Sequence, residues 1–208
     1  MAGTLSEADL VADLKASLFD AKNVFTTADD GDFKRFLQQA LADMQFKRPV
    51  TRLGQITLAA DEGRYPIAEA DFAAFKTDLW REPARLPRPW DPAYPGALPR
   101  VCAVREVDAW FVQFEPAPTA AHLAVLGSTF KFYYFATHAI GAAAADTTIN
   151  PQDRGLLLVR AQAEAMLALG MRNAGKPVQL RDGLSGTPRN STPAALHEML
   201  MKLFKETR

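Results

Sequence analysis

The sequence contains few of the residues from which reactive or cross-linked sites are built. Cys102 is the only cysteine in 208 residues, so neither an internal disulfide nor a multi-cysteine zinc site can form. It lies among apolar residues of a predicted strand, where a buried and inert thiol is expected. The three histidines, His122, His138 and His197, show no His-x-x-x-His or Glu-x-x-His spacing. We therefore predict no metal site, no cofactor and no catalytic residue.

An excess of charge is also missing. Lysine plus arginine equals aspartate plus glutamate at 24 each, and the formal net charge is zero. A domain that binds duplex DNA normally carries a basic excess, so the overall charge gives nucleic-acid binding no support.

Signals for a membrane or for secretion are absent too. The most apolar stretch, residues 123–145, is interrupted by Lys131, His138 and Gly141, whereas a membrane span needs about 20 clean apolar residues. The acidic start lacks a basic region followed by an apolar run, so no signal peptide is expected. These observations predict a protein made and used in a reducing cytoplasm, without membrane association.

The length and the apolar content suit a packed globular protein. The chain is 48% hydrophobic, and its length fits one domain, or one domain with an insertion. We predict an α+β fold: an antiparallel bundle of about four main helices with inserted β-hairpins and a C-terminal docking helix. The predicted layout within a single domain 1–208 is a helix pair at 1–48, a β-rich insertion at 49–145, a long helix at 146–176 and a C-terminal arm at 177–208.

Helical spacing and capping residues predict where the main helices begin. Ser6 is expected to cap a first helix, and Asp30 or Asp32 a second one that ends before Pro49. Asn150-Pro151 predicts a long helix that ends at Asn173, and Thr192-Pro193 a last helix that runs to the C-terminus. A weaker helical pattern covers residues 69–80, and Thr119 is expected to cap one or two turns that end at Gly127.

Alternating residues predict the strands. Residues 55–58 and 64–67 flank Asp61-Glu62-Gly63 and predict a hairpin with Gly63 at the position of positive φ. Pro66 cannot donate to a ladder, so its strand should lie at an edge. A second hairpin is predicted from 101–106 and 109–115, and a strand from 128–138. Both faces of that last strand are largely aromatic, so both are expected to be covered, by this chain or by a neighbouring subunit.

Two polar loops contain residue types that are common at catalytic or ion-binding sites. Gly183-Leu-Ser-Gly186 lacks the Gly-x-Ser-x-Gly spacing of a nucleophile elbow, and no strand precedes it. Asp29-Asp-Gly-Asp32 has neither the glycine nor the glutamate of a calcium loop at the required positions, so helix capping is the better interpretation. The glycines of the first loop could still hold a phosphate through backbone amides. The alternative function is therefore a small cytoplasmic enzyme that binds an anionic substrate through the Arg181–Arg189 loop.

Two other segments have the composition of contact surfaces. Residues 83–99 contain six prolines and should form a stiff, extended loop. Tryptophan, tyrosine and arginine anchor many interfaces, so we predict an intersubunit or partner contact here. Its residues would be Arg85, Arg88, Trp90 and Tyr94. The last helix is strongly amphipathic and follows a long polar loop. Its predicted docking face consists of Pro193, Leu196, Met199, Leu200, Leu203 and Phe204.

Together these features resemble the head-to-tail adaptor (connector) proteins of tailed bacteriophages and of gene transfer particles. Leu10–Leu18 and Asp32–Leu37 look like the first helix pair of that family, and Thr51–Leu58 with Arg64–Ile67 like the short hairpin that follows. The long third helix of the family is similar to Asp153–Met166. Asn190–Leu196 resembles the start of its C-terminal arm.

The resemblance implies a structural virion neck protein, made in the host cytoplasm and located at the head–tail interface. It implies a homo-oligomeric ring, typically of about twelve copies, whose C-terminal helix docks on the portal protein. Its β-loops would meet a stopper or another tail-side neck protein. DNA would make only transient, non-specific contact with the lumen, and zero net charge suits such passage, because a strongly basic lumen would retain DNA. A third hypothesis is a helical adaptor that binds some cytoplasmic protein without forming a ring.

Overall fold

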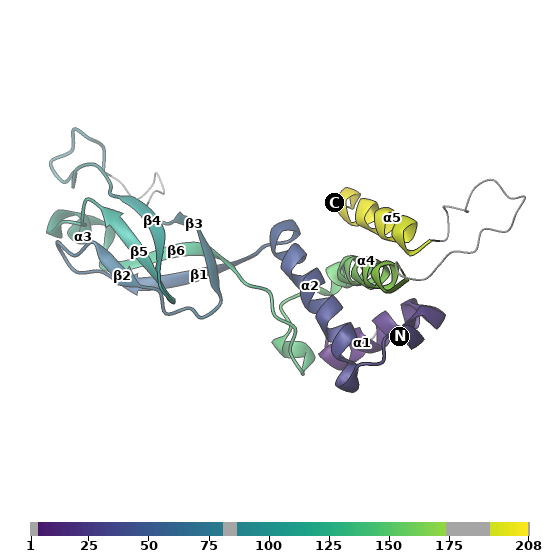
Figure 1. The fold of residues 1–208 in the computed structure, drawn as a ribbon. Coiled ribbons are helices and arrows are strands. Elements are labelled where there is room, and N and C mark those ends of the chain that lie inside the picture. The colour runs from purple at the N-terminus through teal and green to yellow at the C-terminus, as the bar shows by residue number, and fades with distance from the viewer. Residues whose placement is uncertain (1–3, 81–86, 174–191, 208) are drawn as a thin grey trace, which may run out of the picture. The chain divides into compact units, whose positions relative to one another are not determined.

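A computed structural model describes residues 4–80, 87–173 and 192–207. The chain forms two compact units, a helical unit from residues 1–48 and 138–208 and a β unit from residues 49–137 (Figure 1). Each unit has its own hydrophobic core. The predicted α+β class is confirmed, with two small antiparallel sheets.

The helical unit contains four α-helices among its described residues: α1 (Glu7–Ser17), α2 (Gly31–Lys47), α4 (Arg154–Asn173) and α5 (Pro193–Glu206). Short 3-10 turns lie at Phe19–Val24, Ala28–Asp30, Ala144–Asp146 and Pro151–Asp153. The four helices begin and end close to their predicted positions. Their core is formed by apolar residues at helical spacing, among them Leu10, Leu14, Leu37, Met44 and Leu157.

Of the helix caps predicted for the helical unit, two make the expected side-chain hydrogen bond and two do not. The hydroxyls of Ser6 and Thr192 accept hydrogen bonds from backbone amides of α1 and α5, as predicted. Asp30 precedes α2 in a left-handed conformation and makes no side-chain cap bond. Its carboxylate is paired with Lys15 at 2.5 Å. Asn150 makes no side-chain cap bond either.

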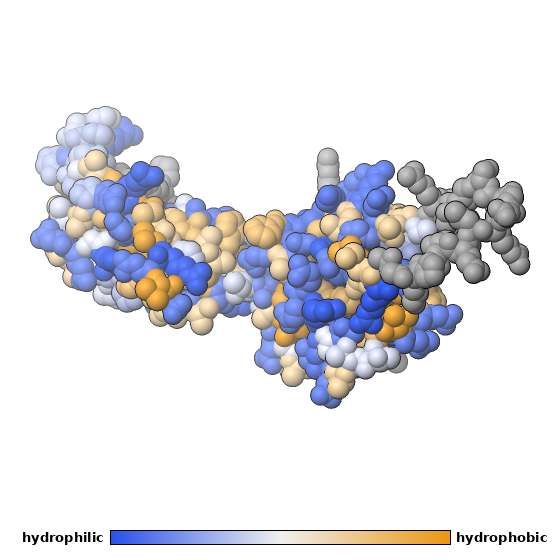
Figure 2. Space-filling view, viewed as in Figure 1, coloured by the Kyte–Doolittle hydropathy of each residue, from blue (hydrophilic) through white to orange (hydrophobic). Residues whose placement is uncertain are grey.

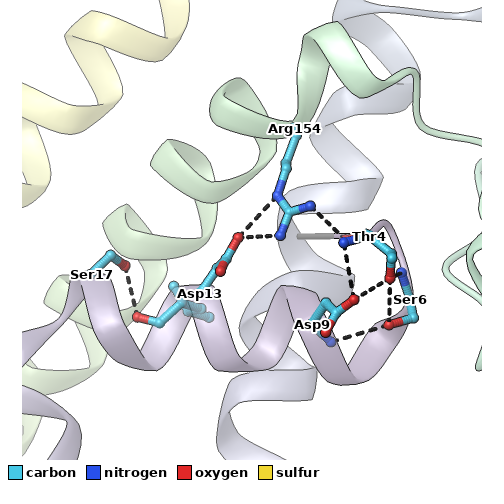
Figure 3. A network of polar contacts seen from close by, with 7 residues as sticks. Thr4, Ser6, Asp9, Asp13, Ser17 and Arg154 are labelled. Carbon is cyan, nitrogen blue, oxygen red and sulfur yellow. Dashed lines mark hydrogen bonds and ion pairs between the residues drawn. The ribbon is translucent and has the colours of Figure 1, made fainter. Parts of the chain in front are cut away.

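An arginine network joins α1 to α4 (Figure 3). Nε of Arg154 donates to Oδ2 of Asp13 at 3.0 Å, and Nη1 donates to the carbonyl of Thr4. Hydrogen bonds from the hydroxyls of Thr4 and then Ser6 hold the pKa of Asp9 below its usual value. Because these contacts satisfy the charged groups within the helical unit, the network is structural.

The β unit consists of two three-stranded sheets with the strand orders β1-β6-β3 and β2-β5-β4. The strands are β1 (Val50–Thr57), β2 (Arg64–Pro66), β3 (Phe72–Asp78), β4 (Arg100–Glu106), β5 (Ala109–Glu115) and β6 (Thr129–Ala136), and the helix α3 covers Ala120–Leu126. Their inward faces share one aromatic core, in which the rings of Phe114 and Phe130 lie 4.9 Å apart. The β4–β5 hairpin and the edge position of Pro66 are as predicted, as is the cap of α3 by Thr119.

The predicted helix over residues 69–80 is wrong, because this segment forms β3, which pairs with β6. Its register shifts between Phe72 and Ala74 and again between Phe75 and Thr77. Each bulge adds one residue to the strand, so the inward positions are spaced by three residues instead of two. That spacing produced the helical pattern in the sequence.

The predicted hairpin around residues 61–63 is also wrong. β1 pairs with β6 and β2 pairs with β5, so the two segments lie in different sheets. The turn between them is held by the hydroxyl of Tyr65, which bonds the amide of Ala59 at 2.8 Å and the carbonyl of Glu62 at 3.1 Å. The residue with positive φ is Asp61 (φ 63°), and Gly63 is not among the positive-φ residues.

The two aromatic faces of β6 differ in burial. Phe130, Phe132 and Tyr134 are buried in the core, whereas Tyr133 on the other face is 36% exposed. Within the described residues, therefore, only one face of this strand is fully covered.

Candidate interaction surfaces

The predicted docking face of α5 is divided between the core and the surface. Leu196, Leu200 and Phe204 pack against the core of the helical unit, and Phe204 is buried. Met199 and Leu203 are 59% and 50% exposed. Pro193 occupies the first turn of α5 and is half-buried. The helix thus uses one edge of its apolar face within the chain and leaves the other edge uncovered.

Polar contacts fix α5 in this position. Nδ1 of His197 donates to the carbonyl oxygen of Ala163 on α4 at 2.9 Å. Nζ of Lys47 donates to the carbonyl of Lys205 at 2.7 Å and lies 5.3 Å from the ring centroid of Phe204. These contacts connect α5 to both α4 and α2.

An open apolar groove of about 330 Å³ lies in the helical unit where α5 and the end of α1 both pack on α4. Phe19, at the rim, is 78% exposed and has a φ of 49°. In the space-filling view, hydrophobic residues reach the surface of this unit (Figure 2). The groove is lined by Ser17, Leu18, Phe19, Ala21, Gln162, Met166, Leu169, Pro193, Leu196, Met199 and Leu200.

The described part of the proline-rich loop, residues 87–99, contains no helix or strand. The amide of Asp91 donates to the carbonyl of Arg88 at 2.8 Å, and that of Tyr94 to the carbonyl of Asp91 at 2.9 Å. Trp90 lies within the first of these turns, is 76% exposed, and has the guanidinium carbon of Arg88 5.4 Å from its ring centroid. Arg85 lies outside the described residues. The loop therefore displays an arginine–tryptophan pair on the first of two consecutive turns.

A buried histidine holds the base of this loop. Nε2 of His122 donates to the carbonyl oxygen of Ala97 at 3.1 Å, which leaves Nδ1 to accept from the amide of Thr119 at 3.2 Å. His122 is 4% exposed, and the adjacent Pro99 is fully buried. Sequence reasoning did not assign this role. The available signal was the Thr119-x-x-His122 spacing, which is that of a capping box.

Substitution of His122 should distinguish its hydrogen bond to the loop from its part in the cap of α3. In His122→Glu, the carboxylate can still accept from the amide of Thr119, but it offers no donor to Ala97. We expect amide hydrogen exchange in residues 88–98 to become at least about tenfold faster, because one hydrogen bond is lost and a buried carboxylate faces a carbonyl oxygen. Exchange in α3 should change less, because its cap bond is kept. His122→Gln restores a donor and should restore slow exchange. Equal exchange in His122→Glu and in the wild type would contradict this assignment.

Asp32 and Tyr134 have shifted pKa values that arise from contacts within the fold. The hydroxyl of Thr27, followed by the charges of Arg172 and Arg35, holds the pKa of Asp32 below its usual range at the start of α2. Burial, followed by the hydrogen bond to Asp71, raises the pKa of Tyr134 to about 12. His138 bonds the carbonyl of Arg48 through Nε2 at 2.8 Å, so the three histidines make three separate contacts.

Residues 4–80, 87–173 and 192–207 contain neither a candidate metal site nor a candidate membrane span. No group of three or more metal-binding side chains comes together in these ranges. Nor does any helix in this part of the chain have the length and the apolar character to cross a membrane. Cys102 is half-buried on β4. The Arg181–Arg189 loop, which carries the alternative enzymatic function, lies outside the described residues.

Comparisons with known proteins give a structural likeness but no family. No protein-family model matches the sequence, and no curated protein matches it. A solved structure described as "Neck of empty GTA particle computed with C6 symmetry" contains a chain with 17% sequence identity and a TM-score of 0.25. The match covers 91% of this chain and 87% of that chain. A TM-score this low does not establish a shared fold.

Proposed function

We propose that this chain is a structural neck adaptor of a phage-like particle and that it has no catalytic role. In this proposal the four helices form the bundle of the adaptor, and on the order of twelve copies assemble into a ring beneath the portal protein. The ring connects the portal to a stopper or another tail-side neck protein and lets DNA pass. The protein is then located in the virion neck.

The observation that carries this proposal is the uncovered edge of the apolar face of α5. Met199 and Leu203 are separated by one helical turn, so their side chains lie side by side on the surface. Anchors with this spacing are typical of a helix that lies in the groove of a partner. Because Leu196, Leu200 and Phe204 already pack on the core, the two exposed residues are free to contact the portal.

Two further features support the proposal. The sequence resembles head-to-tail adaptors from the first helix pair to the start of the C-terminal arm. The zero net charge also suits a channel protein, because a strongly basic lumen would bind DNA through counterion release and resist its movement.

Leu203→Glu tests the docking role of α5. The side chain is 50% exposed, so the melting temperature should stay close to that of the wild type. Binding to the cognate portal protein, measured by biolayer interferometry, should weaken about 30-fold, since an interface anchor contributes at least about 2 kcal/mol. Deletion of residues 192–208 is a poorer test, because it also removes Phe204 from the core.

The matched control is Lys205→Glu, which introduces the same side chain two residues further along α5. Lys205 is exposed, and a separation of two residues places it on the opposite side of the helix from Leu203. Portal binding should change little. Unchanged portal affinity in Leu203→Glu would contradict the proposed docking surface.

A further inference from the structure

Two surfaces of this chain complement each other in shape, apolar character and charge. One is the tip of the loop in the β unit, where Trp90 projects with Arg88 beside it. The other is the apolar groove of the helical unit. Because they are different surfaces of one chain, a contact between them in two copies would be head-to-tail.

The tip is held by hydrogen bonds within the chain. One turn hydrogen bond encloses Trp90 and a second follows it, and His122 bonds the carbonyl of Ala97 at the base of the loop. An exposed indole with two side-chain torsions in such a loop loses little entropy on binding. Tryptophan and arginine are also the residues that most often anchor an interface. The tip therefore has the properties of a preformed anchor.

The groove has the size and the lining for an indole ring. Its volume is about 330 Å³, whereas an apolar cavity of about 150 Å³ already admits benzene. Its wall includes Leu169 and Met166, and methionine side chains adapt readily to an aromatic ring. An aromatic side chain would thus cover apolar surface that the described residues leave open.

The charges at the two surfaces are opposite. Asp20 lies between the lining residues Phe19 and Ala21 and is exposed. Arg88 is exposed beside Trp90, with its guanidinium carbon 5.4 Å from the ring centroid. An indole in the groove would bring this arginine to the rim, where the carboxylate of Asp20 can accept its hydrogen bonds.

We infer that Trp90 of one copy inserts into the apolar groove of a second copy, with Arg88 paired to Asp20 at the rim. The inference rests on the proposed ring function and specifies the contact between its subunits. A head-to-tail contact uses one tip and one groove of every copy, so a closed ring leaves no copy with an empty groove.

A charge exchange tests the pairing in the full-length protein. Arg88→Asp and Asp20→Arg should each raise the concentration for half-assembly by at least about tenfold, measured by sedimentation velocity. The double variant Arg88→Asp/Asp20→Arg should assemble again close to the wild-type concentration. Both positions are exposed, so circular dichroism and melting temperature should be unchanged in all three variants.

A mixing experiment tests the direction of the contact. Trp90→Ala removes the anchor but keeps the groove. Phe19→Asn removes the rim but keeps the anchor, and asparagine tolerates the positive φ of this position. Each variant alone should stay monomeric, whereas an equimolar mixture should form dimers and no larger species, because each pair contains one intact tip and one intact groove.

Three results would overturn the inference. The first is assembly of Trp90→Ala at the wild-type concentration. That result would exclude the contact of Trp90 with the groove, although a ring could still form through another surface. The second is a failure of the double charge variant to assemble although it is folded. The third is a wild-type chain that stays monomeric at every concentration. The portal-binding assay with Leu203→Glu is independent of self-assembly and tests the proposed function separately.

Discussion

Replacing Arg160 with alanine should lower the free energy of unfolding of the helical unit by about 3 kcal/mol. Arg160 is 5% exposed on α4 and connects two helices, since Nε contacts a carboxylate oxygen of Asp43 on α2 and Nη2 contacts Oε1 of Glu164 at 2.5 Å. Its removal leaves Glu164, whose side chain is 17% exposed, without its cation. The loss should lie at the lower end of the range for broken buried pairs, because Asp43 remains 37% exposed to water.

Arg160→Met should be less harmful than Arg160→Ala. Nη1 of Arg160 is buried and has no hydrogen-bond partner within the described residues, and an unsatisfied buried donor opposes folding. Methionine keeps most of the apolar stem and removes this donor, but it leaves Glu164 without its cation as alanine does, so we expect a loss about 1 kcal/mol smaller than that of Arg160→Ala. Urea denaturation followed by far-ultraviolet circular dichroism measures both values.

The control for Arg160 is a second cation–carboxylate pair with the same helical spacing. Lys202 and Glu206 on α5 are 73% and 66% exposed, and exposed pairs contribute little. Lys202→Ala should therefore leave the denaturation midpoint almost unchanged. An equal loss of stability in Lys202→Ala and Arg160→Ala would show that burial does not determine the effect.

Phe132→Ala should destabilise the β unit by about 4 kcal/mol. The side chain is fully buried, and its ring lies within 6.4 Å of the rings of Phe72, Phe75, Phe130 and Tyr134. Alanine would leave a cavity in the middle of this aromatic cluster. Tyr133→Ala, at the neighbouring position on the exposed face of β6, should cost much less. Near-ultraviolet circular dichroism during denaturation distinguishes the two.

Arg160→Ala and Phe132→Ala also test whether the two units unfold independently of each other. The core cluster that contains Leu157 consists only of helical-unit residues, and the cluster that contains Phe132 only of β-unit residues. We therefore expect Arg160→Ala to act mainly on the loss of helical signal and Phe132→Ala mainly on the loss of aromatic signal. A single transition that shifts equally in both variants would contradict this expectation.

The sequence by itself determined the four helices of the helical unit and, to within a few residues, where they begin and end. The apolar stripes, Ser6, Thr192 and Asn150-Pro151 act within one or two turns of chain, so local physical chemistry was enough to place α1, α2, α4 and α5. The β4–β5 hairpin was predictable for the same reason, because its strands are adjacent in the chain and separated by one tight turn. The exposed Trp90 in its proline-rich loop also followed from composition.

Only the tertiary structure decided the strand pairing and the contacts of the site. β6 pairs with β1 and β3, which lie far from it in the sequence, and the bulges in β3 gave a strand the spacing of a helix. The bond from His122 to Ala97 spans 25 residues, and the groove combines residues from both ends of the chain. Such long-range contacts depend on which surfaces meet in the folded chain, and local sequence patterns carry no information about that choice.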